Sequence, residues 1–220
     1  MPASAYIVTA LVSYLLGSIP AGFLVGKAKG IDIRTMGSGN IGATNVFRYL
    51  GTVAGVVVLL ADALKGFLAV AIADRLCWKA FGSGGPLARE WLDIIAGVTA
   101  VLGHNYTCWL HFRGGKGIAT SAGVLVALVP YALLIILGVW ILVVGLTRFV
   151  SLASICASFT LPFATWLTGG SFTMVTITAA MTVLAIYKHK SNIQRLLKGT
   201  ESRIGAKKET QAPETPKPTS

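Results

Sequence analysis

Two long stretches of this chain, residues 117–147 and 149–187, contain no charged side chain. Over the whole sequence only 12% of the residues are charged and 54% are hydrophobic. A soluble domain carries about a quarter charged residues, so the charges here are too few to cover a globule. The composition therefore predicts an all-α integral membrane protein whose solvent is lipid.

The apolar runs are long enough to give several membrane spans. Crossing a hydrocarbon core about 30 Å thick takes about 20 residues at about 1.5 Å per residue. The first run is expected to be a retained span, because it lacks a basic leader and exceeds the apolar core of a signal peptide. A polar loop over 74–90 is expected between the second and third runs. The runs are residues 4–26, 50–73, 92–110, 117–147, 149–167 and 172–188.

The basic residues decide whether 117–147 is one span or two. Lys and Arg favour the cytoplasmic side, and four of them between residues 27 and 48 place that segment inside and the N-terminus outside. One span over 117–147 would put the basic segment that begins at Lys188 outside, whereas a break at Pro130 keeps it inside. We therefore expect seven transmembrane helices, a short one over 117–129 near the active site, and a cytoplasmic C-terminus.

Residues 1–198 are accordingly expected to form one membrane-embedded domain, and 199–220, which are polar and contain three prolines, a disordered cytoplasmic tail. The net charge is +11, but the positive residues lie between apolar runs, where topology and anionic headgroups account for them. The sequence has no RNA-binding signature, so no nucleic-acid partner is predicted. The three cysteines lack C-x-x-C spacing, which is not typical of a disulfide framework or a metal site.

The segment 37–48, GSGNIGATNVFR, is the strongest candidate for an anion site. Its three glycines allow positive φ angles and a close approach of backbone N–H groups to a ligand. A helix that begins near Ala43 would add the positive end of its dipole, and Thr44 and Arg48 would share one face of it. The alternative is a flexible loop with one solvated Arg. The candidate residues are Gly37, Ser38, Gly39, Asn40, Gly42, Thr44, Asn45 and Arg48.

A second candidate segment, residues 103–117, ends on Lys116 between glycines, just before an apolar helix. It is not a Walker A loop, because Gly117 stands where Ser or Thr is required. Lys116 could alternatively be an interfacial anchor, and His104 a polar residue satisfied within the bundle. The candidates here are His104, Gly114, Gly115, Lys116 and Gly117.

Two further pairs lie at helix ends that are expected to face the cytoplasm. Ser151 and Ser154 share a helix face, and they either contact the ligand or permit close helix packing. His189 and Asn192 share a face at the inner end of the last span, where a basic helix end could also be a simple anchor. Cations, amides and hydroxyls converge in this region without a carboxylate cluster, which suits one or two phosphates and not a divalent metal. No cofactor is expected.

Asp62 and Lys65 lie within the second apolar run, three residues apart. Intramembrane charges are costly and by default indicate function. A mutually neutralising structural pair is an equally good interpretation, and the sequence leaves the two open.

Four segments resemble the bacterial acyl-phosphate:glycerol-3-phosphate acyltransferase family, known as PlsY. The likeness runs from about Tyr14 to Leu197, and the twelve-residue first segment makes it specific. It implies a seven-helix enzyme of the bacterial cytoplasmic (inner) membrane, with its active site facing the cytoplasm. The segments are GSGNIGATNVFR at 37–48, GHNYTCWLHFRGGKG at 103–117, SLAS at 151–154 and HKSNIQRLL at 189–197.

The resemblance implies transfer of a fatty acyl group from acyl phosphate to the 1-position of sn-glycerol 3-phosphate, which gives lysophosphatidic acid and phosphate and starts phospholipid synthesis. Neither acyl-CoA nor acyl carrier protein would be used directly. The His-x4-Asp dyad of many glycerolipid acyltransferases is absent, because Trp109, Lys116 and Gln194 stand five residues after the three histidines. The resemblance then implies that the phosphate of the acyl donor supplies the base. The protein is expected to act as a monomer in the lipid bilayer.

We expect five side chains to carry the catalysis by holding the two phosphorylated substrates: Ser38, Arg48, Lys116, His189 and Asn192. A channel or transporter for phosphorylated metabolites is the main alternative function, but it predicts inverted repeats or a polar stripe through the membrane, and the sequence has neither. A lipid phosphotransferase of the CDP-alcohol type would need a set of metal-binding aspartates on one helix, which is also missing.

Overall fold

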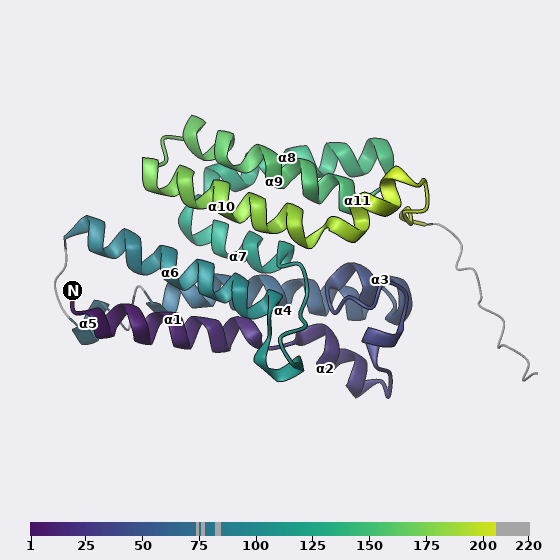
Figure 1. Cartoon of the computed structure of the whole chain (residues 1–220), viewed down its shortest axis with the longest axis horizontal. Coiled ribbons are helices and arrows are strands. Elements are labelled where there is room, and N and C mark those ends of the chain that lie inside the picture. The colour runs from purple at the N-terminus through teal and green to yellow at the C-terminus, as the bar shows by residue number, and fades with distance from the viewer. Residues whose placement is uncertain (74, 76–77, 82–84, 206–220) are drawn as a thin grey trace, which may run out of the picture.

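A computed structural model describes residues 1–73, 75, 78–81 and 85–205, and these residues contain helices and no strand (Figure 1). Cys77, part of the predicted polar loop and residues 206–220 of the predicted tail lie outside the described residues. The elements in chain order are α1 (Ala3–Ser18), α2 (Ala21–Ala28), η1 (Ile33–Thr35), α3 (Ala43–Leu50), α4 (Thr52–Ile72), α5 (Trp78–Phe81), α6 (Pro86–Asn105), η3 (Cys108–Leu110), α7 (Ile118–Leu128), α8 (Pro130–Thr147), α9 (Val150–Leu167), α10 (Phe172–Lys188) and α11 (Lys190–Leu197).

Four described segments are long and apolar enough to cross a membrane: α1 with α2, α4, α8 and α9. α10 with α11 gives a fifth candidate, which is bent by 58° at their junction. α6 has 20 residues but carries three charged side chains near its start, Arg89, Glu90 and Asp93. α7 has only 11 residues. The predicted all-α membrane architecture is confirmed at this level.

The predicted break at Pro130 is confirmed. α7 ends at Leu128 and α8 begins at Pro130, whose missing N–H is tolerated in the first turn of a helix. α7 is the short helix expected over 117–129, and α9 and α10 match the runs 149–167 and 172–188 closely.

The expected first span is confirmed as the candidate span Ala3–Ala28, with a break at Pro20, which has no N–H: α1 ends at Ser18 and α2 begins at Ala21. Two other expected boundaries were wrong. The polar loop 74–90 is shorter than expected, since Trp78–Phe81 is helical and α6 starts at Pro86. The third helix then ends at Asn105 rather than residue 110, and only a turn of 3-10 helix follows.

Small residues set the close packing of the first helices. At Gly17 of α1 an added Cβ would lie 2.1 Å from the Ala100 carbonyl oxygen of α6. At Gly123 of α7 it would lie 1.8 Å from the Ala63 carbonyl oxygen of α4. Helices in lipid gain stability from such backbone contact, because no hydrophobic effect drives them together. α4, α6, α7 and α10 share an apolar core that includes Val70, Leu92, Val124 and Met181.

The elements that carry three of the four candidate segments gather toward one end of the bundle, and the loop between α6 and α7, which carries the fourth, lies nearer the middle (Figure 1). In Figure 1, α3, α11 and the described part of the C-terminal segment lie at the right-hand end, whereas the N-terminus and α5 lie at the left. Because successive helices run in alternating directions, residues near 40, 116, 151 and 190, which are far apart in the sequence, lie in one region.

Candidate active site

The segment Gly37–Gly42 forms a tight loop that leads into α3. Gly37 and Gly39 have φ angles of 54° and 66°, as the sequence predicted, whereas Gly42 has φ −74° and was wrongly included in that expectation. Asn45 is buried and holds the loop: its Oδ1 accepts from the Ser38 N–H at 3.3 Å, and its Nδ2 donates to the Met36 carbonyl at 3.0 Å. α3 begins at Ala43 without a side-chain cap, so its first N–H groups are available to an anion.

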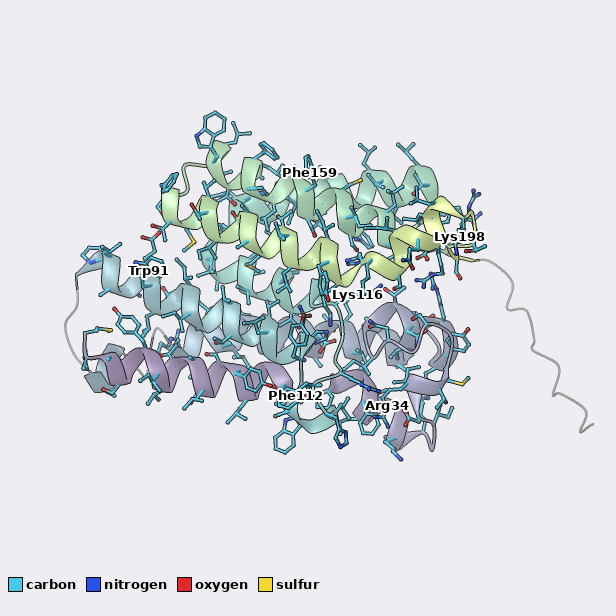
Figure 2. The ribbon with its side chains drawn as sticks, viewed as in Figure 1. Arg34, Trp91, Phe112, Lys116, Phe159 and Lys198 are labelled. Atoms are coloured by element: carbon cyan, nitrogen blue, oxygen red, sulfur yellow. The ribbon has the colours of Figure 1, made fainter. Side chains whose placement is uncertain are left out.

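The segment after α6 folds back over the end of that helix. The Gly114 N–H donates to the Asn105 carbonyl at 3.2 Å, and the Gly115 N–H donates to the His104 carbonyl at 3.0 Å. Gly117 has φ +80° and caps α7. A side chain at position 115 would collide with the His104 ring, since its Cβ would lie 2.1 Å from Nε2. The two glycines therefore allow Lys116 to enter the interior, where Figure 2 shows it between the two groups of helices.

Lys116 reaches across to the last helix. Its Nζ donates a hydrogen bond to Oδ1 of Asn192, 76 residues further along the chain. Asn192 and His189 are both buried at the junction of α10 and α11. His189 Nδ1 lies 2.8 Å from the Ala185 carbonyl oxygen, which can only accept, so the Nδ1 of His189 carries a proton.

One cavity of about 350 Å³ contacts all four candidate segments. We call the part at α3 and α11 the basic end and the deeper part between α7, α8, α9 and α10 the apolar arm. The apolar arm is lined by Leu125, Leu133, Ile136, Leu137, Trp140, Ala157, Leu161 and Met181. The predicted site residues that line the cavity are Ser38, Asn40, Gly42, Thr44, Asn45, Arg48, His104, Lys116, Gly117, Ser151, Ser154, His189 and Asn192.

Four predicted site residues do not line the cavity: Gly37, Gly39, Gly114 and Gly115. Each belongs to a loop that carries lining residues, so their effect on the site is through backbone shape.

Ser154 lines the cavity while its hydroxyl donates to the Val150 carbonyl at 2.9 Å and accepts from the Trp140 indole at 3.2 Å.

Glu201 is the site residue that the sequence reasoning missed, because it was assigned to a disordered tail. Its carboxylate accepts hydrogen bonds from Ser151 Oγ at 2.6 Å, Asn192 Nδ2 at 2.7 Å and Arg195 Nε at 2.7 Å. The next carbonyl, that of Ser202, accepts from Arg48 at 2.9 Å. The segment Gly199–Gly205 is thus part of the site. One signal was available: Glu201 is the only acidic residue between Asp93 and Glu209.

The basic end is electrostatically crowded. Burial is the main cause that lowers the pKa of Lys116 to about 8; Glu201 opposes this shift, and the positive charges of Arg195, Arg48 and Lys188 contribute to it. Burial opposes the charge of Glu201, but the hydrogen bonds from Ser151, Asn192 and Arg195 hold the pKa of that carboxyl below its ordinary value. An added anion would relieve the repulsion between the cations, so this end favours binding of phosphate.

Asp62, Lys65 and His104 form a buried cluster beside the cavity. Lys65 Nζ lies 2.8 Å from Asp62 Oδ1 and 3.0 Å from His104 Nδ1. The two charges are therefore a contacting pair, as one of the two sequence interpretations held, and the cluster also contacts the cavity through Asp62 and His104. Among the described residues no group of three His, Cys, Asp or Glu side chains could hold a metal ion.

The fold and the cavity define a class: an integral membrane protein whose helices enclose a basic, phosphate-compatible end joined to an apolar arm. A family model described as glycerol-3-phosphate acyltransferase matches residues 7–199. The glycerol-3-phosphate acyltransferase of Desulforudis audaxviator is 46% identical over 209 residues, 94% of this chain and 100% of that protein. That of Fusobacterium nucleatum subsp. nucleatum is 44% identical over 88% of this chain and 95% of its own length.

Two crystal structures of PlsY, an integral membrane glycerol 3-phosphate acyltransferase, share this fold at 40% identity. The glycerol 3-phosphate form has a TM-score of 0.81 and covers 91% of this chain and 96% of its own. The lysophosphatidic acid form has a TM-score of 0.79 and covers 91% and 95%. The chain belongs to the glycerol-3-phosphate acyltransferase family, and the family resemblance of its four segments is confirmed.

Proposed function

We propose that this protein transfers a fatty acyl group from acyl phosphate to the 1-hydroxyl of sn-glycerol 3-phosphate, which yields lysophosphatidic acid and inorganic phosphate. The observation that carries the proposal is the continuity of the basic end with the apolar arm in one cavity. An acyl phosphate has the same two-part character, a doubly charged phosphate joined to a long hydrocarbon chain.

Several groups at the basic end are suited to hold two phosphates. Arg48 offers a planar fork of donors, and Lys116 a point charge. Ser38 and the first turn of α3 add neutral donors. Asn192 has its amide oxygen turned to Lys116 and its amide nitrogen turned to Glu201. This arrangement supports the roles expected of Ser38, Arg48, Lys116, His189 and Asn192.

The acyl transfer does not need a protein carboxylate as base, because every bond and proton is accounted for by the two substrates. The 1-hydroxyl oxygen bonds to the acyl carbonyl carbon, the bond from that carbon to the phosphate oxygen breaks, and the hydroxyl proton passes to a phosphate oxygen of the donor. The protein then supplies position and charge: cations stabilise the departing phosphate, and N–H groups can stabilise the carbonyl oxygen. Glu201 is not a candidate base, since three donors already hold its carboxylate.

The same proposal includes the membrane topology. Five apolar candidates, together with α6 and the short α7, would make seven crossings, with the N-terminus outside and the basic end at the cytoplasmic face of a bacterial inner membrane. The proposal also includes action as a monomer in the bilayer.

The test is an assay of the purified protein in lipid nanodiscs with acyl phosphate and glycerol 3-phosphate, in which lysophosphatidic acid is measured. Acyl-CoA replaces acyl phosphate in a parallel reaction, and we expect product only from the phosphate. Turnover with acyl-CoA at a comparable rate would contradict the donor assignment. Uptake of glycerol 3-phosphate into liposomes without acyl transfer would favour the transporter instead.

Two variants connect the activity to the site. Arg48→Ala and Lys116→Ala should each reduce turnover by at least about 100-fold, because each removes a charge-assisted contact to a phosphate. Lys198→Ala is the matched control, since Lys198 is exposed at the end of α11 (Figure 2). Near-normal turnover in either site variant, with the control unchanged, would reject the assignment.

A further inference from the structure

The cluster of Asp62, Lys65 and His104 has no part in the chemistry described so far. All three side chains are buried, with exposed fractions of 1%, 4% and 4%. Asp62 and Lys65 lie on α4, and His104 lies at the end of α6. Three polar groups inside a lipid-embedded bundle are costly to bury, and two of them line the cavity.

Lys65 is surrounded by three acceptors. Its Nζ lies 2.7 Å from the Ile19 carbonyl oxygen, 2.8 Å from Asp62 Oδ1 and 3.0 Å from His104 Nδ1. The Ile19 carbonyl is accessible because the helix breaks at Pro20. An ammonium has three N–H donors and no acceptor; Lys65 Nζ donates to the Ile19 carbonyl and is within hydrogen-bond distance of the His104 ring nitrogen, and its contact with Asp62 is an ion pair. The negative charge of Asp62 balances the positive charge of Lys65, and the cluster can stay ionised without a net charge.

This geometry fixes the tautomer of His104. A nitrogen that accepts a hydrogen bond from an ammonium cannot itself carry a proton, so Nδ1 of His104 is unprotonated. If Nδ1 carried a proton, that proton would face the Lys65 ammonium, whose Nζ lies 3.0 Å from Nδ1. The nearest carboxylate oxygen that could accept it, Asp62 Oδ1, lies 3.4 Å from Nδ1. The ring is therefore neutral, with its one proton on Nε2.

Nε2 points toward the loop that carries Lys116. It is the His104 atom that a Cβ added at Gly115 would meet first, at 2.1 Å, and it makes no hydrogen bond to any of the residues that the structure describes. His104 lines the cavity next to Lys116 and Gly117. A neutral ring in this position offers one directed N–H to the cavity and adds no positive charge to the crowded basic end.

We propose that Lys65 and Asp62 are positioning residues that hold His104 as a neutral donor, so that its Nε2–H donates a hydrogen bond to an anionic oxygen of the bound phosphorylated substrate. This assignment rests on the proposed function for the identity of the substrate. It does not depend on which acyl donor is used. His104 and His189 then differ in role, because the proton of His189 lies on Nδ1 and faces a carbonyl.

The direct test is nuclear magnetic resonance of the full chain labelled with 15N-histidine in nanodiscs. The chain has only three histidines, and spectra of His111→Gln and His189→Gln assign the His104 signals by elimination. We expect a protonated Nε2 and an unprotonated Nδ1 for His104, and a shift of the Nε2 signal when glycerol 3-phosphate or inorganic phosphate is added. A proton on Nδ1, protons on both nitrogens, or an Nε2 signal unmoved by both ligands would overturn the proposal.

Variants of the cluster separate positioning from simple stability. In Lys65→Met, Nδ1 loses its donor and faces the Asp62 carboxylate, so the proton should move to Nδ1. Because a lone buried carboxylate is strongly destabilising, the double variant Asp62→Asn/Lys65→Met removes both charges and lets the new side-chain amide at position 62 donate to Nδ1. The double variant should regain the Nε2 proton and part of the activity. A folded double variant with the proton on Nδ1, or with no more activity than Lys65→Met, would contradict the proposed role.

Lys188→Met is the matched control for the tautomer. Lys188 donates to the Asn105 carbonyl at 3.0 Å and is a neighbouring cation, but it has no bond to the His104 ring. In Lys188→Met the proton of His104 should stay on Nε2. A change of tautomer in this variant would show that the general positive charge nearby, and not the Lys65 contact, sets the tautomer of His104.

Kinetics test the donor itself. His104→Phe should lower kcat/KM about 10- to 100-fold, the loss expected for one hydrogen bond to a charged group. His104→Gln keeps an N–H and should lose less than about tenfold. Equal loss in both variants, or none in His104→Phe, would reject the donor role. Wild-type activity with acyl phosphate is measured alongside, so failure of the proposed function is seen separately from failure of the His104 assignment.

Discussion

Asn192 donates a 2.7 Å hydrogen bond from Nδ2 to Oε1 of Glu201, while its Oδ1 accepts from Lys116. The amide is therefore held in one orientation, with its nitrogen toward the carboxylate and its oxygen toward the cation. Glu201 also accepts from Ser151 and Arg195. One carboxylate beyond the last helix thus connects α9, α11 and, through Asn192, the loop before α7.

Replacement of Glu201 by Ala should lower both stability and turnover. Ser151, Asn192 and Arg195 would lose their shared acceptor, and hydrogen bonds to a charged group contribute about 1.5–3 kcal/mol each. We expect a lower midpoint of thermal unfolding and at least about a tenfold loss of kcat/KM. Ser202→Ala is the control, because Ser202 contacts Arg48 through its main-chain carbonyl. Unchanged stability and activity in Glu201→Ala would exclude this organising role.

The pKa of Lys116, lowered by burial to about 8, predicts an alkaline limit to activity. Lys116 must be protonated to hold a phosphate, so kcat/KM, which reports the free enzyme, should fall as pH rises through about 8. Lys116→Arg should remove this limit if it is active, since Arg stays charged. A pH profile flat to about pH 10, or the same alkaline limb in an active Lys116→Arg, would contradict the role of Lys116.

The same pKa shift has the opposite effect on stability. The ordinary pKa of 10.5 applies to the unfolded chain, and the folded value is about 8. Between these values the unfolded chain binds the proton and the folded one does not, so the contribution of Lys116 to the free energy of unfolding rises with pH. Compared with Lys116→Met, the ligand-free protein should gain stability from about pH 8 to about pH 10 in denaturation experiments, and an identical pH trend in both would contradict this assignment.

Gly123→Ala should destabilise the bundle. The new Cβ would meet the Ala63 carbonyl oxygen at 1.8 Å and push α7 away from α4. The expected cost is about 1–3 kcal/mol, as for other overpacked interiors, measured as a fall in the midpoint of thermal unfolding. Gly138→Ala in α8 is the matched control, because nothing lies within 4 Å of its added Cβ. Similar stability in the two variants would disprove the close α4–α7 contact.

Ala157→Leu should shorten the acyl chains that the enzyme accepts. Ala157 is buried and lines the apolar arm, and a larger side chain would fill space that the proposed function gives to hydrocarbon. We expect KM to rise for long-chain acyl phosphates and to change little for short ones. Competition between two chain lengths in one assay measures the ratio directly. An unchanged preference would remove the apolar arm from the acyl site.

The local sequence was enough to predict most of the helices, and most of the predicted candidate residues line one cavity. Uncharged runs predicted α8, α9 and α10, and charge asymmetry predicted the break that Pro130 makes. Gly37 and Gly39 adopt positive φ as their type suggests. These features depend on residues close in the chain and on the surrounding solvent, so composition and spacing are enough to predict them. The same reasoning missed the break at Pro20, where a proline lies inside a run that is apolar on both sides.

Only the tertiary structure decided which distant groups meet. The Lys65–His104 contact joins residues 39 apart, and the Ser151–Glu201 hydrogen bond joins residues 50 apart. Neither pair has a periodic or local signal, because each contact depends on how separate helices pack and on where the chain turns back after α11. The sequence by itself determined a lipid-embedded helical protein with the four segments of the glycerol-3-phosphate acyltransferase family. The packing determined that Glu201 belongs to the site and that the charges of Asp62 and Lys65 act on His104.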